Sequence, residues 1–241
     1  MTHSSTRATR DNLAESGDPA LARCDRVART FGFGMAAVVA VHEASCAVPP
    51  GARIALTGPS GSGKSTLLHL IAGLEIPTSG TVTWPGLGGG PPQGRPGLIG
   101  MIFQGPSLLP TLNVTENVAL PLQFAGVPGT TAGERAERAL DQLGIKEMGA
   151  RLPEELSGGQ AQRVAVARAV ASRPKLILAD EPTGRLDHET AGRVISVLLQ
   201  AADELDAALV ISTHDSEIAA RLPERWTMSD GALRRQDGPR R

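Results

Sequence analysis

The sequence contains no tyrosine, and aromatic residues make up only 2% of its 241 positions. No apolar run reaches the roughly 18 residues that a bilayer-crossing helix requires, so no membrane-spanning segment is predicted. The net charge of −1 leaves no basic surplus of the kind that marks nucleic-acid binding, and no nucleic-acid partner is expected. Cys24 and Cys46 form no Cys-x-x-Cys pair, which favours buried or half-buried thiols in a reducing cytosol.

The hydrophobic fraction of 41% is enough for a sizeable core, in one large domain or two small ones. Residues 1–22 are polar and have no apolar centre, so they are predicted to be a disordered leader and not a signal peptide. The basic end from Arg234 is also expected to be disordered, with 236–241 as a tail. This leaves 23–235 as the predicted domain.

The central motif of the chain runs from Gly58 to Thr66 and fits the pattern G-x-x-x-x-G-K-[ST]. An apolar run precedes it and another follows it, which is the strand, loop and helix context that a phosphate-binding loop needs. Lys64 supplies a full charge for the β- and γ-phosphates, and the Ser65 hydroxyl can ligate Mg²⁺. The predicted binding residues are Gly58, Pro59, Ser60, Gly61, Ser62, Gly63, Lys64, Ser65 and Thr66.

Strands are predicted to alternate with helices, which indicates a parallel sheet. Strands are expected at Val38–Val41, Arg53–Thr57, Thr81–Thr83, Ile99–Phe103, Leu176–Ala179 and Leu209–Ser212. Helices are expected over Glu134–Leu143, from an N-cap at Ser157 to a stop before Pro174, and over Glu189–Asp206. The Gly/Pro-rich stretch Trp84–Leu98 should form neither, and Asp230-Gly231 predicts a hairpin over Trp226–Leu233.

A second nucleotide signal lies at the end of the apolar strand that starts at Leu176. Asp180 at the end of this strand would lie beside the Mg²⁺ of a bound nucleotide. Glu181 follows it and can orient and deprotonate an attacking water. The pattern is weak alone, because many buried strands end in Asp, but the phosphate loop upstream strengthens it.

The stretch Leu156–Gln160 reads Leu-Ser-Gly-Gly-Gln, in which two glycines follow an N-cap serine and open a helix whose free N–H groups can bind an anion. The alternative to anion binding is a simple helix start, in which the glycines only allow a tight turn. This stretch resembles the signature of the ATP-binding cassette (ABC) ATPases, the nucleotide-binding subunits of ABC transporters. The resemblance covers roughly 29–235, with several motifs in the family's order.

The resemblance implies an α/β P-loop NTPase fold with a RecA-like parallel-sheet core, an antiparallel β subdomain and a small helical subdomain, here at approximately 105–165. It implies ATP and Mg²⁺ as cofactors. Gly58–Thr66 resembles the Walker A motif, Leu176–Asp180 resembles Walker B, and Glu181 resembles the catalytic base.

The other motif residues carry roles by the same resemblance. Gln104 resembles the Q-loop glutamine, which senses Mg²⁺ and faces the membrane subunit, so the implied metal set is Ser65, Gln104 and Asp180. His214 resembles the switch histidine that contacts the γ-phosphate, and Asp187 the D-loop aspartate. The signature residues are Ser157, Gly158, Gly159 and Gln160.

The adenine platform departs from the family pattern, because the family commonly stacks adenine on a tyrosine and this chain has none. Phe31 lies about where that tyrosine would be, and its ring can still stack without a hydroxyl. Phe33 is the competing candidate for the adenine platform. Either ring could instead pack in the hydrophobic core and have no role in binding adenine. Phe31 is the favoured platform.

Further stretches resemble the branch of the family that serves lipoprotein release, macrolide and peptide export and cell division: Phe103-Gln104, Leu108–Pro110, Glu116–Leu122 and Glu181–Gly184. Membership implies a second copy of the chain, packed head to tail with ATP between the copies, and a separate integral membrane permease. It places the protein in the cytoplasm, peripheral on the inner face of the cell membrane through that permease.

Two other functions stay open at this point. One is a regulatory ABC ATPase that acts on a permease-like partner without transport. The other is a soluble ABC ATPase of DNA repair or translation, which is disfavoured because the chain has one cassette and no sustained heptads between Walker A and the signature.

Overall fold

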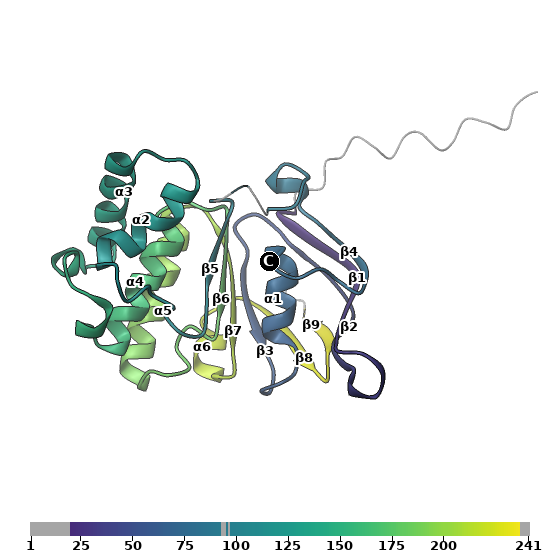
Figure 1. Ribbon diagram of the computed structural model, residues 1–241. Coiled ribbons are helices and arrows are strands. Elements are labelled where there is room, and N and C mark those ends of the chain that lie inside the picture. Colours follow the sequence, from purple (N-terminus) through teal and green to yellow (C-terminus); the bar gives the residue numbers. More distant parts are fainter. Residues whose placement is uncertain (1–19, 93–94, 96, 237–241) are drawn as a thin grey trace, which may run out of the picture.

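The fold is given by a computed structural model that describes residues 20–92, 95 and 97–236 (Figure 1). Most of the predicted leader and the residues after 236 lie outside the described part.

The predicted domain boundaries need correction by a few residues. Ala20 and Leu21 are buried, strand β1 begins at Ala22, and Gln236 is the last residue of a strand and not part of a tail. The backbone of Leu21, Ala22 and Gln236 pairs with neighbouring strands, and the Ala20 carbonyl accepts the Gly86 N–H, which explains why the domain extends beyond 23–235.

One mixed sheet of nine strands forms the centre of the described part, in the order β4-β1-β2-β9-β8-β3-β7-β6-β5. Its first part is antiparallel and consists of β1 (Ala22–Phe31), β2 (Val38–Val48) and β4 (Ser79–Thr83). Strand β1 was not predicted individually, because bulges interrupt its register with β2 and blur the alternation of apolar residues.

The second part of the sheet is parallel, as predicted. Its strands are β3 (Arg53–Thr57), β5 (Ile99–Ile102), β6 (Leu176–Asp180) and β7 (Ala208–Thr213). Every residue of β6 and β7 is buried, as expected for strands of a parallel sheet covered on both faces. Strands β8 (Glu224–Ser229) and β9 (Ala232–Gln236) form the predicted hairpin, whose turn residues Asp230 and Gly231 both have positive φ.

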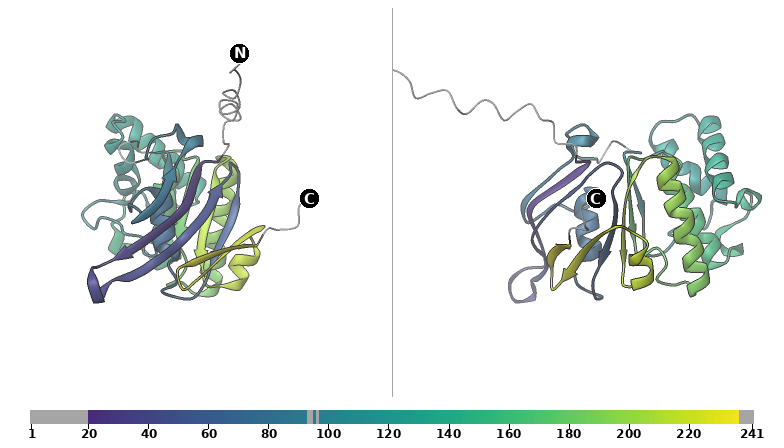
Figure 2. Two further views of the ribbon diagram at one scale, coloured as in Figure 1. Left: turned by 90° about the vertical axis from the view of Figure 1, so that its right-hand side faces the viewer. Right: turned by 180° about the vertical axis from the view of Figure 1, so that it is seen from behind.

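Helices cover both faces of the parallel strands. Helix α1 (Lys64–Ala72) lies between these strands and the antiparallel part (Figure 1). Helices α5 (His188–Glu204) and α6 (Ser216–Ala220) pack on the opposite face (Figure 2). Strand β6 divides its side chains between the two cores, because Leu176 and Leu178 join the α1 side whereas Ile177 and Ala179 join the other.

The remaining helices form the side of the molecule beyond β5 and β6 (Figure 1). They are α2 (Val114–Phe124), α3 (Gly129–Gln142) and α4 (Gly158–Val170), with 3-10 turns at Lys146–Met148 and Pro153–Glu155. These elements fall largely within the predicted helical subdomain. Helix α3 begins five residues before the predicted Glu134, with Pro128 as its N-cap. In the described part of the chain, no helix combines the length and the hydropathy needed to cross a membrane.

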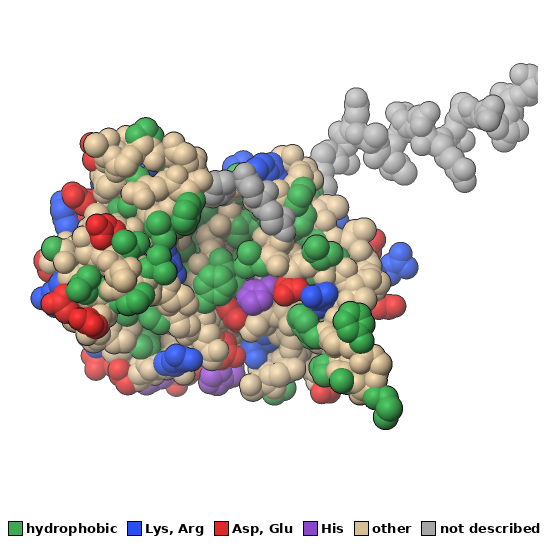
Figure 3. Space-filling view, viewed as in Figure 1, with side chains coloured by type: hydrophobic (Ala, Val, Ile, Leu, Met, Phe, Trp, Pro, Cys, Tyr) green, Lys and Arg blue, Asp and Glu red, His purple; other side chains and the backbone are tan. Residues whose placement is uncertain are grey.

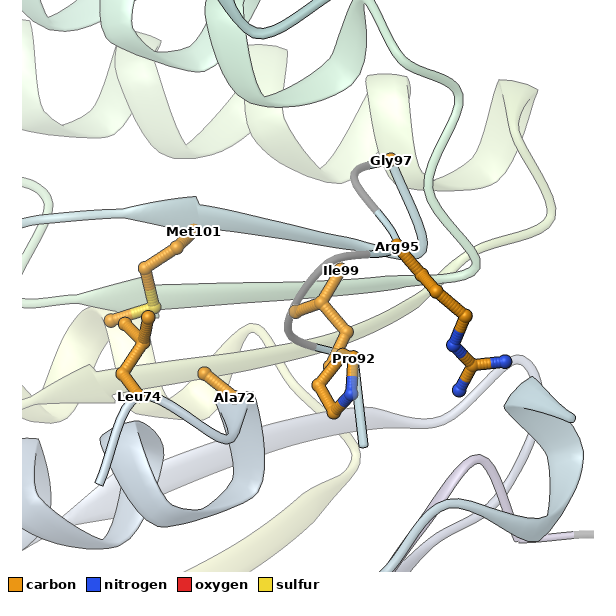
Figure 4. Close-up of a pocket in the computed structure, with 7 residues that line it drawn as sticks. All are labelled: Ala72, Leu74, Pro92, Arg95, Gly97, Ile99 and Met101. Carbon is orange, nitrogen blue, oxygen red and sulfur yellow. The ribbon is translucent and has the colours of Figure 1, made fainter. Parts of the chain in front are cut away.

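The Gly/Pro-rich stretch after β4 is more regular than predicted. A 3-10 turn spans Pro85–Leu87, where the fixed φ of proline suits a first helical position and Gly88 ends the turn in the left-handed region. Trp84 is buried and its indole N–H donates to the Ile71 carbonyl at 2.8 Å. Farther along, the Arg95 guanidinium donates to the carbonyls of Leu87, Gly90 and Pro91 and so holds the loop together. In Figure 4 the Arg95 side chain points away from Met101 and Leu74.

Candidate active site

The phosphate loop connects β3 to α1 and needs glycine at two positions for steric reasons. A Cβ on Gly58, which has φ of 146°, would collide with the carbonyl oxygen of Met228. A Cβ on Gly63, which has φ of 98°, would collide with the carbonyl oxygen of Ala40. The loop is therefore wedged between β2 and β8, and its conformation depends on both glycines.

Lys64 is the first residue of α1 and is 4% exposed. Its ammonium donates to the carbonyls of Gly58 and Pro59, both at 3.0 Å. Nζ also lies 3.3 Å from Oε1 of Glu181. Buried cations need such partners, so the loop holds the lysine charge at the centre of the predicted phosphate site. Ser65 and Thr66 continue the first turn of the helix, with Ser65 exposed to solvent.

Two acidic residues follow each other at the end of β6, and one serine contacts the carboxylate of the first and the backbone N–H of the second. Asp180 is buried, and its Oδ1 accepts a hydrogen bond of 2.6 Å from the Ser212 hydroxyl. The same hydroxyl accepts the backbone N–H of Glu181 at 2.8 Å. Glu181 has φ of 42°, a left-handed conformation that is rare for a residue with a side chain and that turns the chain sharply at the end of the strand.

Three predicted site residues converge on the Glu181 carboxylate. The Gln104 amide donates to Oε2 at 3.5 Å, Nδ1 of His214 lies 3.6 Å from the same oxygen, and Lys64 faces Oε1. Gln104 comes from the segment after β5 and His214 from the end of β7. The carboxyl ends of parallel strands thus bring these groups together.

The donor set suits a hard cation that is shared with phosphate. The described residues contain no group of three or more His, Cys, Asp or Glu side chains that could hold a metal ion. One carboxylate (Asp180), one hydroxyl (Ser65) and one amide (Gln104) fit Mg²⁺, which is usually held by one or two carboxylates together with substrate phosphates.

The signature residues lie at the start of α4, as predicted. The Ser157 hydroxyl accepts the Gln160 N–H at 3.3 Å, and the Gln160 side chain accepts the Ser157 N–H at 2.8 Å, which together form a capping box. Gly159 is buried, and a Cβ there would collide with the methyl group of Thr190.

Asp187 caps the neighbouring helix α5, where its carboxylate accepts the Thr190 N–H at 3.0 Å. This hydrogen bond lowers the pKa of the Asp187 carboxyl below its ordinary value. The predicted D-loop and signature are thus packed together through Thr190.

The structure does not bring all predicted residues into one site. Glu181 and His214 line one pocket of about 190 Å³, together with Thr183, Gly184 and Asp215. Ser157, Gly159 and Gln160 line a different pocket of about 730 Å³ between α4 and α5. In the part of the chain that the structure describes, no hydrogen bond or ion pair links the signature to Lys64 or Glu181.

The candidate adenine rings lie on the hairpin between β1 and β2. Phe31 pairs with Val38 of β2. Two residues farther along β2, the Ala40 carbonyl lies against Gly63, so the part of the hairpin that carries Phe31 lies near the phosphate loop. Phe31 is 39% exposed, and the Arg29 guanidinium lies 4.5 Å from the centre of its ring. Phe33 is 95% exposed in the turn between β1 and β2. Figure 3 shows hydrophobic side chains gathered at the tip of this hairpin, at the lower right.

A groove of about 430 Å³ runs between β5 and the helices beyond it. Its lining is mainly apolar and includes Met101, Phe103, Leu120, Pro121 and Phe124. Phe124 is 79% exposed and Phe103 is 37% exposed. A smaller apolar pocket adjoins it beside Leu74 and Met101 (Figure 4).

Sequence reasoning missed the bridging role of Ser212 and the stacking of Arg29 on Phe31. Ser212 follows an apolar run and precedes His214, so a polar residue at the end of a buried strand was the available signal. Its two partners lie more than thirty positions away in the chain, which no local pattern reveals.

Comparison with known proteins agrees with this geometry. A family model described as ABC transporter matches residues 41–184. The lipoprotein-releasing system ATP-binding protein LolD of Legionella pneumophila (strain Paris) is 42% identical over 211 residues, which cover 85% of this chain and 93% of that protein. LolD of Idiomarina loihiensis is 36% identical over 225 residues, which cover 91% of this chain and 99% of that protein.

Solved structures show the same fold. The ATP-binding cassette MJ0796, described as a dimer in a post-hydrolysis state bound to ADP and Pi, aligns with a TM-score of 0.82 at 32% identity. The alignment covers 91% of this chain and 99% of that one. The protein cbiO1 from Clostridium perfringens, part of the ABC transporter complex cbiONQ, aligns with a TM-score of 0.78 at 25% identity and covers 90% and 88% of the two chains.

Proposed function

The chain belongs to the ABC transporter family of ATPases, and we propose that it is the ATP-hydrolysing subunit of a lipoprotein-release system. The observation that carries the proposal is the convergence of Lys64, Gln104 and His214 on the Glu181 carboxylate. The cargo is inferred from the two LolD relatives, which are named as ATP-binding proteins of lipoprotein-releasing systems.

Each residue of this cluster has a role in the proposed reaction. Lys64 and the N–H groups of the phosphate loop bind the phosphates, and Glu181 accepts a proton from the attacking water. His214 contacts the γ-phosphate. Asp180, Ser65 and Gln104 would hold Mg²⁺, which supplies positive charge to the phosphate oxygens when bound. Ser212 holds the carboxylate of the metal ligand Asp180 and the backbone N–H of the base Glu181.

We further propose that two copies of the chain complete each other's sites. The signature at Ser157–Gln160 is an anion-binding helix start that lines a pocket apart from Glu181. A head-to-tail pair related by a two-fold axis would place the signature of one copy against the phosphates held by the other. The similar cassette MJ0796 is described as a dimer bound to ADP and Pi, which supports an assembly of two copies.

The proposed membrane partner docks in the apolar groove beside β5. The groove carries exposed aromatic rings at Phe103 and Phe124, and it begins where the chain leaves Gln104. An exposed apolar patch of this kind marks an interaction surface. Docking of a permease there would hold the protein on the inner face of the cell membrane.

A cross-linking experiment tests the partner. A photo-activatable residue at Phe124 in whole membranes should capture an integral membrane protein, whereas the same group at exposed Gln200 on α5 should not. Recovery of soluble proteins alone from Phe124 would count against docking. Lipoprotein release by the co-purified complex, driven by ATP, would support the cargo. Hydrolysis without cargo movement would favour the regulatory alternative.

A further inference from the structure

The segment that follows Gln104 is held by an arginine of the signature helix. Arg168 lies in the last turn of α4, and its two terminal nitrogens donate to consecutive carbonyls, Nη1 to Ser107 at 2.8 Å and Nη2 to Pro106 at 2.9 Å. Among the described residues no carboxylate pairs with this guanidinium. Burial lowers the pKa of the Arg168 guanidinium below its ordinary value. The hydrogen bonds to the two carbonyls replace part of the hydration that the side chain loses.

The turn that Arg168 holds is strained and short. Ser107 has φ of 46°, a left-handed conformation that surrounding contacts must maintain. Its hydroxyl donates to the Gly105 carbonyl at 3.2 Å. Only Gly105 separates Gln104 from the clamped Pro106, so the guanidinium limits where the Gln104 amide can lie relative to Glu181.

The other end of the same helix carries the signature. Helix α4 runs without interruption from the capping box at Ser157 to Val170. Next to Arg168 it presses against β5, because a Cβ on Gly100 would lie 2.7 Å from the Ala169 carbonyl oxygen. At its C-terminal end the signature helix therefore meets the edge strand β5 through Ala169 and the turn after Gln104 through Arg168.

That point lies in the apolar groove. Arg168, Ser107, Gly100 and Ala169 all line it, together with Phe103 and Phe124. We propose that Arg168 is a positioning residue, which holds the turn after Gln104 and so keeps the Gln104 amide beside the Glu181 carboxylate. This positioning is a property of the isolated chain, and it rests on the proposed function only in the role given to Gln104.

The test is the substitution Arg168→Lys, because an ammonium keeps the charge but cannot donate in parallel to two carbonyls. In the isolated protein we expect kcat for ATP hydrolysis to fall about tenfold with KM changed by less than about twofold, as for loss of one charge-assisted hydrogen bond. The amides of Ser107 and Leu108 should exchange with deuterium faster, while those of α5 stay unchanged.

Two controls keep the result specific. Arg173→Lys alters an exposed arginine five residues farther along and should leave kcat and exchange unchanged. Arg168→Ala should lower kcat further than the lysine variant, which marks partial rescue by the retained charge. An Arg168→Lys protein with wild-type kcat, or with kcat and KM changed only as its melting temperature falls, would overturn the positioning role. The turnover and exchange measurements use the isolated protein. Their outcome therefore does not depend on whether the cross-linking experiment captures a membrane protein.

Discussion

Lys64 Nζ lies 3.3 Å from Glu181 Oε1, so the phosphate loop and the proposed catalytic carboxylate share one ion pair. Lys64 is nearly fully buried and has two carbonyl partners besides, which means that its charge stays satisfied if Glu181 is neutralised. The ion pair therefore connects the phosphate-binding lysine to the proposed catalytic base. The stability of the fold does not depend on the Glu181 charge, because Lys64 keeps its two carbonyl partners. Substitutions at the two positions should have different consequences.

Lys64→Ala should abolish measurable ATP hydrolysis and weaken ATP binding by at least about tenfold, because it removes a charged partner of the phosphates. Equilibrium binding of ATP and steady-state turnover measure both effects. Lys146→Ala is the matched control, since Lys146 is an exposed lysine in the 3-10 turn after α3. Unchanged affinity and turnover in Lys64→Ala would refute the assignment of the phosphate loop.

Phe31→Ala should weaken ATP binding by about 1–3 kcal/mol, the size of one lost base-stacking contact. The Arg29 guanidinium lies over the Phe31 ring, and Phe31 lies at the hairpin end nearest the phosphate loop. Phe33→Ala is the control, because its ring is almost fully exposed at the hairpin tip. If ATP binding is weakened in Phe33→Ala and unchanged in Phe31→Ala, Phe33 and not Phe31 is the ring that stacks on adenine.

Ser212→Ala should lower kcat strongly and destabilise the protein by about 1–3 kcal/mol, because it leaves a buried oxygen of Asp180 without its donor. Ser196→Ala on α5 removes a hydroxyl that only bonds within its own helix and to Arg221, so it should change little. Thermal unfolding and turnover of both variants provide the comparison. Normal kcat in Ser212→Ala would show that hydrolysis does not need the hydroxyl between the Asp180 carboxylate and the Glu181 backbone N–H.

The parts of the fold that the sequence predicts well are those with strong local patterns. The strands around Ile177 and Val210 are continuous apolar runs, and the hairpin turn needs Asp-Gly for its positive φ values. Ser157 marks the start of α4 because its side chain caps the helix locally. Local rules suffice wherever one segment determines its own conformation.

The remainder depends on contacts between distant segments. The bulges of β1 hide its alternation, and the 3-10 turn at Pro85–Leu87 forms in a stretch that lacks any helical period. The Arg168 clamp joins residues about sixty positions apart, which no local pattern predicts. The separation of the signature from Glu181 is also invisible in a linear sequence.

Dimerisation of Glu181→Gln in saturating ATP tests the central claim most directly. The amide keeps the shape of the side chain but cannot accept the proton of the attacking water, so ATP should stay uncut between two copies. Light scattering after size-exclusion chromatography should show a dimer with ATP and a monomer without it. Adding Ser157→Arg should restore the monomer, because the bulky side chain would block the opposing phosphates. A Glu181→Gln protein that binds ATP and stays monomeric would contradict the two-copy site.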